Sequence, residues 1–438
     1  MTIGDSLTEE YYFEFPFSAP SSTPILGFAN TQNWVEILAE QRYNDFDFGS
    51  YEEEWPFGYG DLRLAGYQYN FGIPGYDTRM WMDILDPVTN PFDPDFDPVT
   101  LSLALTTRAA MRETYENVDV IVIMVGGNDV NFQYGDLYES LPGDTFATSF
   151  TAEVLGNLGA FIDEIRNHTT DVPIVLADVP DLGVAPDIIA DHPDVLKRAN
   201  ASAIINALNT ELATLATNRN VTLARISELT DRLLSPDPFY IAGHEMIKDT
   251  DPLENNRPEY LFCWQGLHPS TNGQAIIANT LLNAINLASG TSIQQLGNRE
   301  ILENLLGLNP DQPYLDWAQT QHLSDASMAS DSDGDGIPNL GKYLLGLNPL
   351  SVDETHIATF ETINSEDYLS LQYTLDTDAL RIANADVKYS TNLNDWLEVP
   401  PNGLINLNSN SYEARIAISD LPNEGTRAFL RIEFTLNP

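Results

Sequence analysis

Gly4-Asp5-Ser6-Leu7, followed at once by Thr8-Glu9-Glu10, stands directly after the short apolar run Met1 to Ile3. The run predicts a strand, and the glycine and aspartate predict that it ends in a turn. A serine in such a turn occupies the position in which an α/β enzyme presents a nucleophile. The same residues would also fit a strand end with a serine that caps a helix. Three later segments decide between these interpretations.

Two of these segments are strands that end in glycine turns. An aromatic strand runs from Tyr67 into Asn70-Phe-Gly72-Ile-Pro-Gly75. The segment Asp119 to Val125 is rich in β-branched residues, which predicts a strand buried on both faces and therefore a parallel one. It is followed by Gly126-Gly-Asn128-Asp129. Because open α/β sheets place their sites at the carboxyl ends of strands, this turn is a candidate site.

The last segment, Gly266-Leu-His268-Pro269, precedes an apolar helix expected from about 273 to 287. Between the third and fourth segments, helical spacing alternates with strands. Such alternation predicts βαβ units, that is, a parallel sheet with helices on both faces. We expect helices at about 150–167 and 195–217, and strands at 172–179 and 221–226.

Together the four segments resemble the GDSL, or SGNH, hydrolase family, over roughly residues 1–290. The resemblance implies a flavodoxin-like α/β fold and assigns catalysis to Ser6, Gly72, Asn128 and His268. The residue chemistry agrees. The Ser6 hydroxyl needs a base, and the near-neutral pKa of a histidine suits that role. The Asn128 amide and the backbone N–H groups of Ser6 and Gly72 can form an oxyanion hole. No cofactor is needed for this chemistry.

One residue departs from the family pattern. The family usually carries aspartate three residues before the histidine, where it orients the imidazole and stabilises its cation. Gln265 stands there instead. A glutamine can accept a hydrogen bond from Nδ1 but supplies no negative charge, and the Trp264 carbonyl is an equal candidate for that acceptor. We therefore predict a Ser–His dyad.

The size and charge of the chain limit its partners. With 438 residues it should hold two or three domains. It carries 20 Lys and Arg against 65 Asp and Glu, a net charge of −45. Such a surface repels nucleic acid and anionic membranes, and no apolar run is long enough to span a bilayer. The charge suits an extracellular or saline setting, and we expect a secreted protein. The single cysteine, Cys263, excludes a disulfide framework.

The chain changes character after the predicted catalytic domain, residues 1–289. Residues 290–353 read as a helical linker in which Leu305-Leu-Gly-Leu-Asn-Pro310 recurs as Leu344-Leu-Gly-Leu-Asn-Pro349. Between the copies, Asp331, Asp333 and Asp335 alternate with small residues, as calcium loops require, although Lys342 stands where such a loop has its bidentate glutamate. A structural Ca²⁺ and a merely acidic, flexible linker are both open.

Residues 354–438 carry short alternating strands separated by turn signals, which predicts a small all-β sandwich. We therefore expect a secreted serine esterase acting on short-chain acyl esters, with O-acetyl groups on carbohydrate as the favoured target. One alternative is a lipase or lysophospholipase. Another is a non-catalytic glycan-binding or adhesion protein on a hydrolase frame, which Gln265 would favour. The partner is then a small-molecule or carbohydrate ester, and the oligomeric state is open.

Overall fold

Five short parallel strands form the central sheet in the order β4-β1-β5-β6-β7. The first strand therefore lies between the second and third strands of the sheet, as in flavodoxin-like folds. The predicted parallel α/β architecture is confirmed. The strands are β1 (Thr2–Gly4), β4 (Asn70–Gly72), β5 (Ile121–Met124), β6 (Ile174–Ala177) and β7 (Thr222–Ala224).

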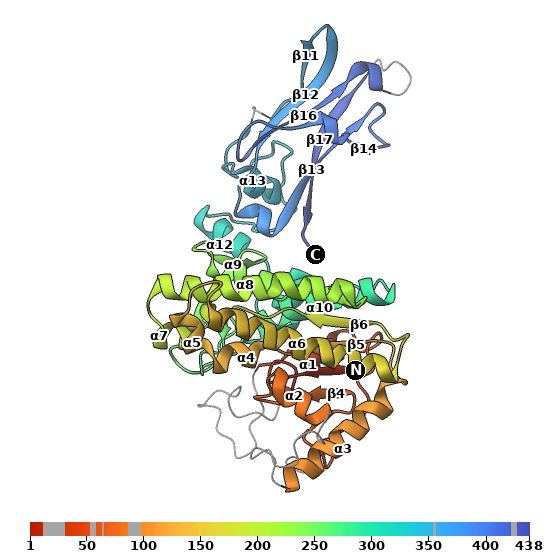
Figure 1. Cartoon of the computed structure of the whole chain (residues 1–438). Coiled ribbons are helices and arrows are strands. Elements are labelled where there is room, and N and C mark those ends of the chain that lie inside the picture. The colour runs from red at the N-terminus through yellow and green to blue at the C-terminus, as the bar shows by residue number, and fades with distance from the viewer. Residues whose placement is uncertain (12–30, 53–57, 64, 86–97, 354–355, 422–426) are drawn as a thin grey trace. The chain divides into compact units, whose positions relative to one another are not determined.

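The computed structural model describes residues 1–11, 31–52, 58–63, 65–85, 98–353, 356–421 and 427–438. Within these ranges the chain divides into two units (Figure 1). The first unit comprises Met1–Phe239 and Met246–Leu296, and the second comprises Tyr240–Glu245 and Gly297–Pro438.

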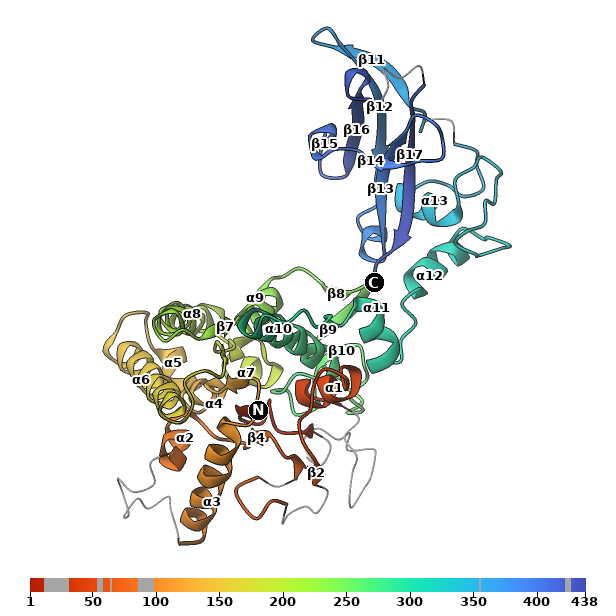
Figure 2. The same cartoon turned by 90° about the vertical axis from the view of Figure 1, so that its right-hand side faces the viewer.

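Helices cover both faces of the sheet. Helices α1 and α10 pack against each other on one face, whereas α2, α6 and α8 lie on the other (Figure 2). The helices of the first unit are α1 (Trp34–Gln41), α2 (Thr78–Leu85), α3 (Pro98–Tyr115), α4 (Gly127–Phe132), α5 (Tyr134–Glu139), α6 (Thr145–His168), α7 (Pro186–Asp191), α8 (Val195–Asn218), α9 (Ser227–Leu234), α10 (Thr271–Ser289) and the short turn Leu182–Val184.

The inner strands have no polar face because helices cover them on both sides. All four residues of β5 and of β6 are buried. Burying one such Val, Leu or Ile side chain contributes about 1.5–3 kcal/mol. Two further sets of strands lie outside the central sheet. One is the pair β2 (Tyr51–Glu52) and β3 (Gly66–Tyr67). The other is a three-stranded sheet of β8 (Phe239–Ile241), β9 (His244–Thr250) and β10 (Tyr260–Phe262).

The second unit contains two antiparallel sheets, β11-β12-β16-β15 and β14-β13-β17. Leu371, Val387 and Ala414, from strands of both sheets, share one apolar cluster with Leu345 of helix α13. Its elements are α11 (Asn298–Glu300), a π-helical turn (Ile301–Leu305), α12 (Gln312–Thr320), α13 (Asn339–Leu345), β11 (Thr359–Ile363), β12 (Glu366–Thr374), β13 (Ala383–Ser390), β14 (Leu397–Glu398), β15 (Leu404–Asn406), β16 (Ser411–Ala417), β17 (Phe429–Leu436) and short 3₁₀ turns at Ala379–Arg381, Pro401–Gly403 and Ile418–Asp420.

The segment after α10 belongs with the first unit. The Arg42 guanidinium donates to the carbonyls of Gln294 at 2.7 Å and Gln295 at 3.0 Å, and Asn279 exchanges two hydrogen bonds with Leu296. The sequence predicted that the catalytic domain ends at residue 289. These contacts favour a boundary after Leu296 for a truncated catalytic domain.

A helix that crosses a bilayer must be both long and apolar, and the described helices can be compared with this requirement. None of them combines the length and the hydropathy that a bilayer crossing requires.

Candidate active site

Three of the predicted site residues lie at the carboxyl ends of adjacent strands. Ser6 follows β1, Gly72 ends β4, and Asn128 follows β5. The register pairs Gly4 with Gly72 on one side and with Met124 on the other, so the three strands end level with one another. Parallel topology thus gathers residues that are far apart in the sequence at one edge of the sheet.

The fourth predicted residue reaches this edge on a loop between β10 and α10. The His268 Nε2 atom lies 2.7 Å from the Ser6 Oγ atom. The loop is held by a hydrogen bond from the Cys263 N–H to the His268 carbonyl, at 2.9 Å, and by a bridge between Phe262 and Pro269. The nucleophile and the candidate base are therefore within direct proton-transfer distance.

Asn128 lies in the first turn of α4 and is almost fully buried. Its Nδ2 atom donates to the Tyr76 carbonyl at 3.1 Å, which leaves the second amide hydrogen for another acceptor. The helix begins at Gly126, where φ is +124° and a Cβ would lie 2.8 Å from Val179. Only glycine tolerates both constraints, so the Gly-Gly-Asn turn is fixed by backbone geometry.

Gly72 allows a close backbone approach. A Cβ on this residue would lie 2.3 Å from the Glu9 backbone nitrogen. The turn after Ser6 therefore packs directly on the end of β4, and any side chain at position 72 would displace it.

Two carboxyl groups are buried beside these residues. The Asp5 Oδ1 atom accepts from the Leu7 N–H at 2.9 Å, and burial raises the Asp5 pKa to about 7. Asp129 accepts from the Thr78 N–H at 2.9 Å and from the Thr78 hydroxyl at 2.6 Å, and burial raises its pKa to about 6. These bonds fix the start of α2, so Asp129 has a structural role.

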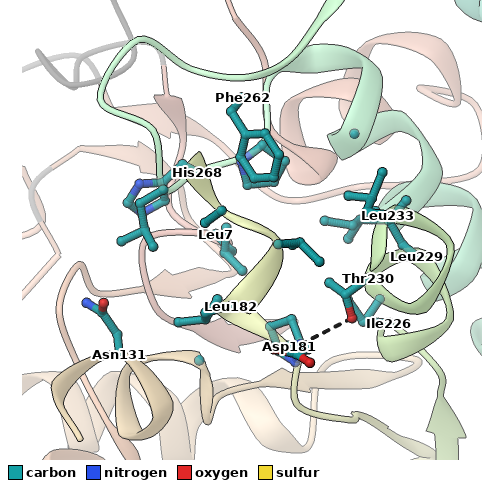
Figure 3. A pocket seen from close by; sticks show the side chains of 18 of the residues that line it. Leu7, Asn131, Asp181, Leu182, Ile226, Leu229, Thr230, Leu233, Phe262 and His268 are labelled. Atoms are coloured by element: carbon teal, nitrogen blue, oxygen red, sulfur yellow. Dashed lines mark hydrogen bonds between the residues drawn. The ribbon is translucent and has the colours of Figure 1, made fainter. Parts of the chain in front are cut away.

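A narrow pocket with a cavity volume of about 70 Å³, partly open to solvent, extends from Ser6 and His268 into the unit. Figure 3 shows His268 on one side of this pocket and Leu229 and Leu233 of α9 on the other. Sequence reasoning missed this wall, although Leu229 and Leu233 stand at the i, i+4 spacing of one helix face. The other apolar residues that line it are Leu7, Pro180, Leu182, Val184, Ala185, Ile226, Leu261, Phe262, Pro269 and Ile277.

Burial also shifts the pKa values of two titratable side chains in the histidine loop. It lowers the His268 pKa to about 4, so the imidazole is neutral at physiological pH. The Tyr11 ring meets this imidazole edge-on, with centroids 6.4 Å apart. Cys263 is fully buried, and burial raises the pKa of its thiol to about 12, which makes it an inert apolar residue.

Gln265 contacts the His268 ring through its amide nitrogen. Its Oε1 atom accepts from the backbone N–H groups of Leu267, at 2.5 Å, and of His268, at 3.2 Å. Its Nε2 atom faces the His268 Nδ1 atom at 2.6 Å. Of the two acceptors considered for Nδ1, the Gln265 amide oxygen is therefore not available, because the backbone already holds it.

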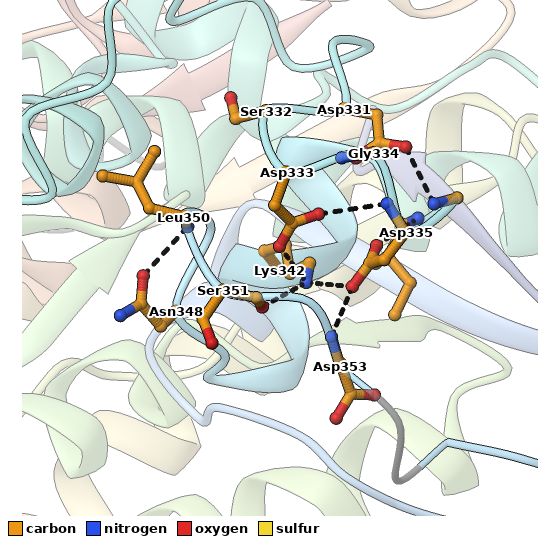
Figure 4. Close-up of polar contacts among 12 residues, drawn as sticks. Asp331, Ser332, Asp333, Gly334, Asp335, Lys342, Asn348, Leu350, Ser351 and Asp353 are labelled. Atoms are coloured by element: carbon orange, nitrogen blue, oxygen red, sulfur yellow. Dashed lines mark hydrogen bonds and ion pairs between the residues drawn. The ribbon is translucent and has the colours of Figure 1, made fainter.

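The acidic loop of the second unit brings its three carboxylates together: ligand atoms of Asp331, Asp333 and Asp335 lie within 4.8 Å of one another. The Lys342 ammonium stands among them, and its side chain is only 1% exposed. It donates to Asp333 at 2.8 Å, to Asp335 and to the Ser351 carbonyl (Figure 4). A Ca²⁺ ion and this ammonium would compete for the same oxygens, so calcium binding stays a prediction.

A family model described as GDSL-like lipase/acylhydrolase matches residues 1–281. No curated protein matches the chain. Solved structures similar to it include an acetylxylan esterase from Geobacillus stearothermophilus, at 17% identity over 65% of this chain and 92% of that one, with a TM-score of 0.33. Another is a carbohydrate esterase family 3 protein from Talaromyces cellulolyticus, at 16% over 67% and 98%, with a TM-score of 0.33.

An extracellular lipase from Streptomyces rimosus is similar at 17% identity, over 66% of this chain and 97% of that one, with a TM-score of 0.34. Similarities at this level say nothing about the substrate of the present chain. The family match covers well over half of the sequence, including all four strand-end and loop motifs. The chain is therefore an esterase that belongs to the GDSL-like lipase/acylhydrolase family.

Proposed function

We propose that the chain is a secreted serine esterase that cleaves carboxylic esters through an acyl-enzyme on Ser6. The observation that carries the proposal is the 2.7 Å contact between the Ser6 Oγ and His268 Nε2 atoms at the mouth of an apolar pocket. Secretion is supported only by the net charge of −45, which suits an extracellular setting.

The reaction follows from the positions of these groups. His268 takes the hydroxyl proton as the Ser6 oxygen attacks the ester carbonyl, and the carbonyl oxygen becomes an oxyanion. The Asn128 amide and the backbone N–H groups of Ser6 and Gly72 stabilise it. When the intermediate collapses, the C–O bond to the alcohol breaks, and His268 returns the proton to the leaving alcohol. Water then hydrolyses the acyl-enzyme through the same steps, which frees the acid and restores Ser6.

The lining of the pocket bears on the acyl group. The pocket volume of about 70 Å³ suits a short acyl group, and acetyl esters are the favoured expectation from the sequence. The apolar walls formed by Leu229, Leu233 and Phe262 favour an apolar acyl chain, which a lipase or lysophospholipase would also take. Each methylene buried there contributes about 0.8 kcal/mol, or roughly a fourfold gain in kcat/KM.

Hydrolysis of p-nitrophenyl acetate, butyrate and octanoate by the wild type and by Ser6→Ala tests both parts. We expect release of p-nitrophenol by the wild type alone, an acyl adduct on Ser6 by mass spectrometry, and a rise in kcat/KM from acetate to butyrate. Equal, residual rates for the two proteins would instead support the non-catalytic alternative.

The chain offers a matched pair of variants for the acyl pocket. Leu233→Trp fills the pocket and should shift the preference toward acetate. Leu234→Trp adds the same indole to the neighbouring residue, which is 44% exposed and does not line the pocket. It should leave the preference unchanged. If both variants retain the wild-type preference, the acyl chain does not bind between α9 and β10.

A further inference from the structure

The orientation of the Gln265 amide is fixed by its own loop. The two backbone N–H groups of Leu267 and His268 both point at the Oε1 atom. If the amide were rotated by half a turn, its NH₂ group would face these two donors, and both hydrogen bonds would be lost. Because an amide nitrogen only donates and a backbone N–H only donates, the observed orientation is the one that the contacts permit.

This orientation determines which nitrogen of His268 carries the proton. The Gln265 Nε2 atom lies 2.6 Å from the His268 Nδ1 atom and can only donate to it. Nδ1 must therefore be unprotonated. A neutral imidazole carries one N–H, so its proton resides on Nε2, the nitrogen that lies 2.7 Å from the Ser6 Oγ atom.

A base for Ser6 needs the other tautomer. The nitrogen that faces the hydroxyl must offer a lone pair, and the proton must sit on Nδ1, where the usual family aspartate accepts it. We propose that Gln265 is a positioning residue that holds His268 in the Nε2–H tautomer, so that the resting enzyme turns over only through a minor tautomer and works far below the capacity of its site.

The same contact opposes the cation that forms during the reaction. After Nε2 has taken the Ser6 proton, an imidazolium with N–H groups at both nitrogens would point Nδ1–H at the Gln265 NH₂ group. A donor then faces a donor, and the amide supplies no negative charge to offset the cation. Burial already disfavours the imidazolium, since it lowers the His268 pKa to about 4.

The isosteric variant Gln265→Glu removes this obstacle without changing the shape of the loop. One carboxylate oxygen keeps the two backbone hydrogen bonds, and the other replaces the NH₂ group and accepts from Nδ1–H. In serine-protease triads, an amide in place of the carboxylate lowers kcat about 10⁴-fold through the wrong tautomer. We expect Gln265→Glu to raise kcat for p-nitrophenyl butyrate by about 10²-fold or more.

Nitrogen NMR of the wild type, labelled with ¹⁵N-histidine, tests the tautomer directly and needs no substrate. His268→Asn identifies the His268 signals by their loss. At pH 7 the wild type should show a protonated Nε2 and an unprotonated Nδ1, and Gln265→Glu should move the proton to Nδ1. A protonated Nδ1 in the wild type overturns the proposal, whether or not any variant folds.

Kinetics supply the second arm, which rests on the proposed function. Gln133→Glu makes the same chemical change elsewhere in the catalytic unit and should not raise kcat. Gln265→Glu combined with His268→Ala should lose the gain, which shows that the gain acts through the histidine. If the wild type hydrolyses the ester and Gln265→Glu is no faster, the proposal is overturned. If NMR shows the Nε2–H tautomer in the wild type, but neither the wild type nor Gln265→Glu hydrolyses an ester, only the proposed function is refuted.

Discussion

Gln265 and Lys342 each replace a carboxylate that the surrounding sequence pattern calls for, and they do so with opposite consequences. Gln265 stands where the family has aspartate, and Lys342 stands where a calcium loop has glutamate. Both side chains are well bonded. The amide joins two backbone N–H groups to the imidazole, and the ammonium joins Asp333, Asp335 and the Ser351 carbonyl.

The two substitutions differ because the two sites need different groups at the substituted position. The acidic loop needs only a positive charge at its centre, and the three protons of Lys342 meet three acceptors. The active site needs an acceptor at Nδ1 during the reaction, and Gln265 presents a donor. A buried polar substitution can therefore satisfy every hydrogen bond of the resting protein and still oppose its chemistry.

The largest effect is expected from removing the nucleophile or the base. Ser6→Ala and His268→Ala should each lower kcat at least about 10³-fold, and the double variant should be little worse, because the two act as one unit. Steady-state kinetics with one short ester, together with circular dichroism as a check on folding, measures this. Losses that multiply in the double variant would show that the 2.7 Å contact is not a working pair.

The second-largest loss of activity is expected from removing the oxyanion donor Asn128. Asn128→Ala should lower kcat by about 10²–10³-fold, with a smaller change in KM, because an oxyanion donor acts mainly in the transition state. Asn131→Ala, a change to another asparagine that lines the pocket, is the matched comparison and should affect KM more than kcat. If Asn128→Ala changes KM alone, the residue binds the ground state instead.

Substitution of Lys342 tests how much its buried ion pairs contribute to the stability of the second unit. Removing one partner of a buried ion pair costs about 3–5 kcal/mol. Lys342→Met should destabilise the second unit by this order, as measured by urea unfolding, and leave kcat/KM unchanged. Lys197→Met removes the 40% exposed partner of Glu139 and should cost under about 1 kcal/mol. Equal, small losses in the two variants would show that the Lys342 contacts contribute little.

The pH dependence of kcat/KM should sharpen the role of His268. A protonated imidazole cannot accept the Ser6 proton, so activity falls as the pH falls through the His268 pKa, which burial lowers to about 4. Gln265→Glu should move this acid limb to higher pH, because a carboxylate stabilises the imidazolium. A limb near pH 7 in both proteins would belong to Asp5, whose pKa burial raises to about 7. An unmoved acid limb in the variant would mean that position 265 does not act on His268.

The free energy of unfolding should also depend on the protonation of His268, and it should fall as the pH falls, as the activity does. The folded pKa of about 4 lies below the ordinary value of 6.5. The unfolded chain therefore binds more protons between these values, and the stability that the neutral His268 contributes is present above pH 6.5 and is lost as the pH falls through 4.

The sequence predicted most of the catalytic unit because its elements are periodic. The helices expected at 150–167 and 195–217 are α6 and α8, and the strand expected at 119–125 contains β5. Ser6, Gly72, Asn128 and His268 were found because chain order and strand topology bring them to one edge. Their roles in catalysis stay predictions for the variants above.

Two features of the site were beyond the sequence for a physical reason. Whether the Gln265 amide donates or accepts depends on where two backbone N–H groups of its own loop point, and no spacing encodes that direction. The pocket wall on α9 depends on how a short helix packs against β10. Its Leu229–Leu233 pair is visible in the sequence, but only packing places the pair beside Ser6.

The smallest effect is expected from calcium itself. Lys342 neutralises Asp333 and Asp335, and their hydrogen bonds outweigh the effect of burial and raise the Lys342 pKa, so the ammonium stays charged in the loop. A Ca²⁺ ion would have to displace a tethered cation that already has three acceptors. The wild type should therefore show equal proteolysis of the linker and equal thermal unfolding with Ca²⁺ and with a chelator. Lys342→Glu restores the carboxylate of a calcium loop at position twelve and should become calcium-dependent in both assays. Stabilisation of the wild type by Ca²⁺ would show that the loop binds the metal despite Lys342. Lys342 would then not replace the function of the missing glutamate.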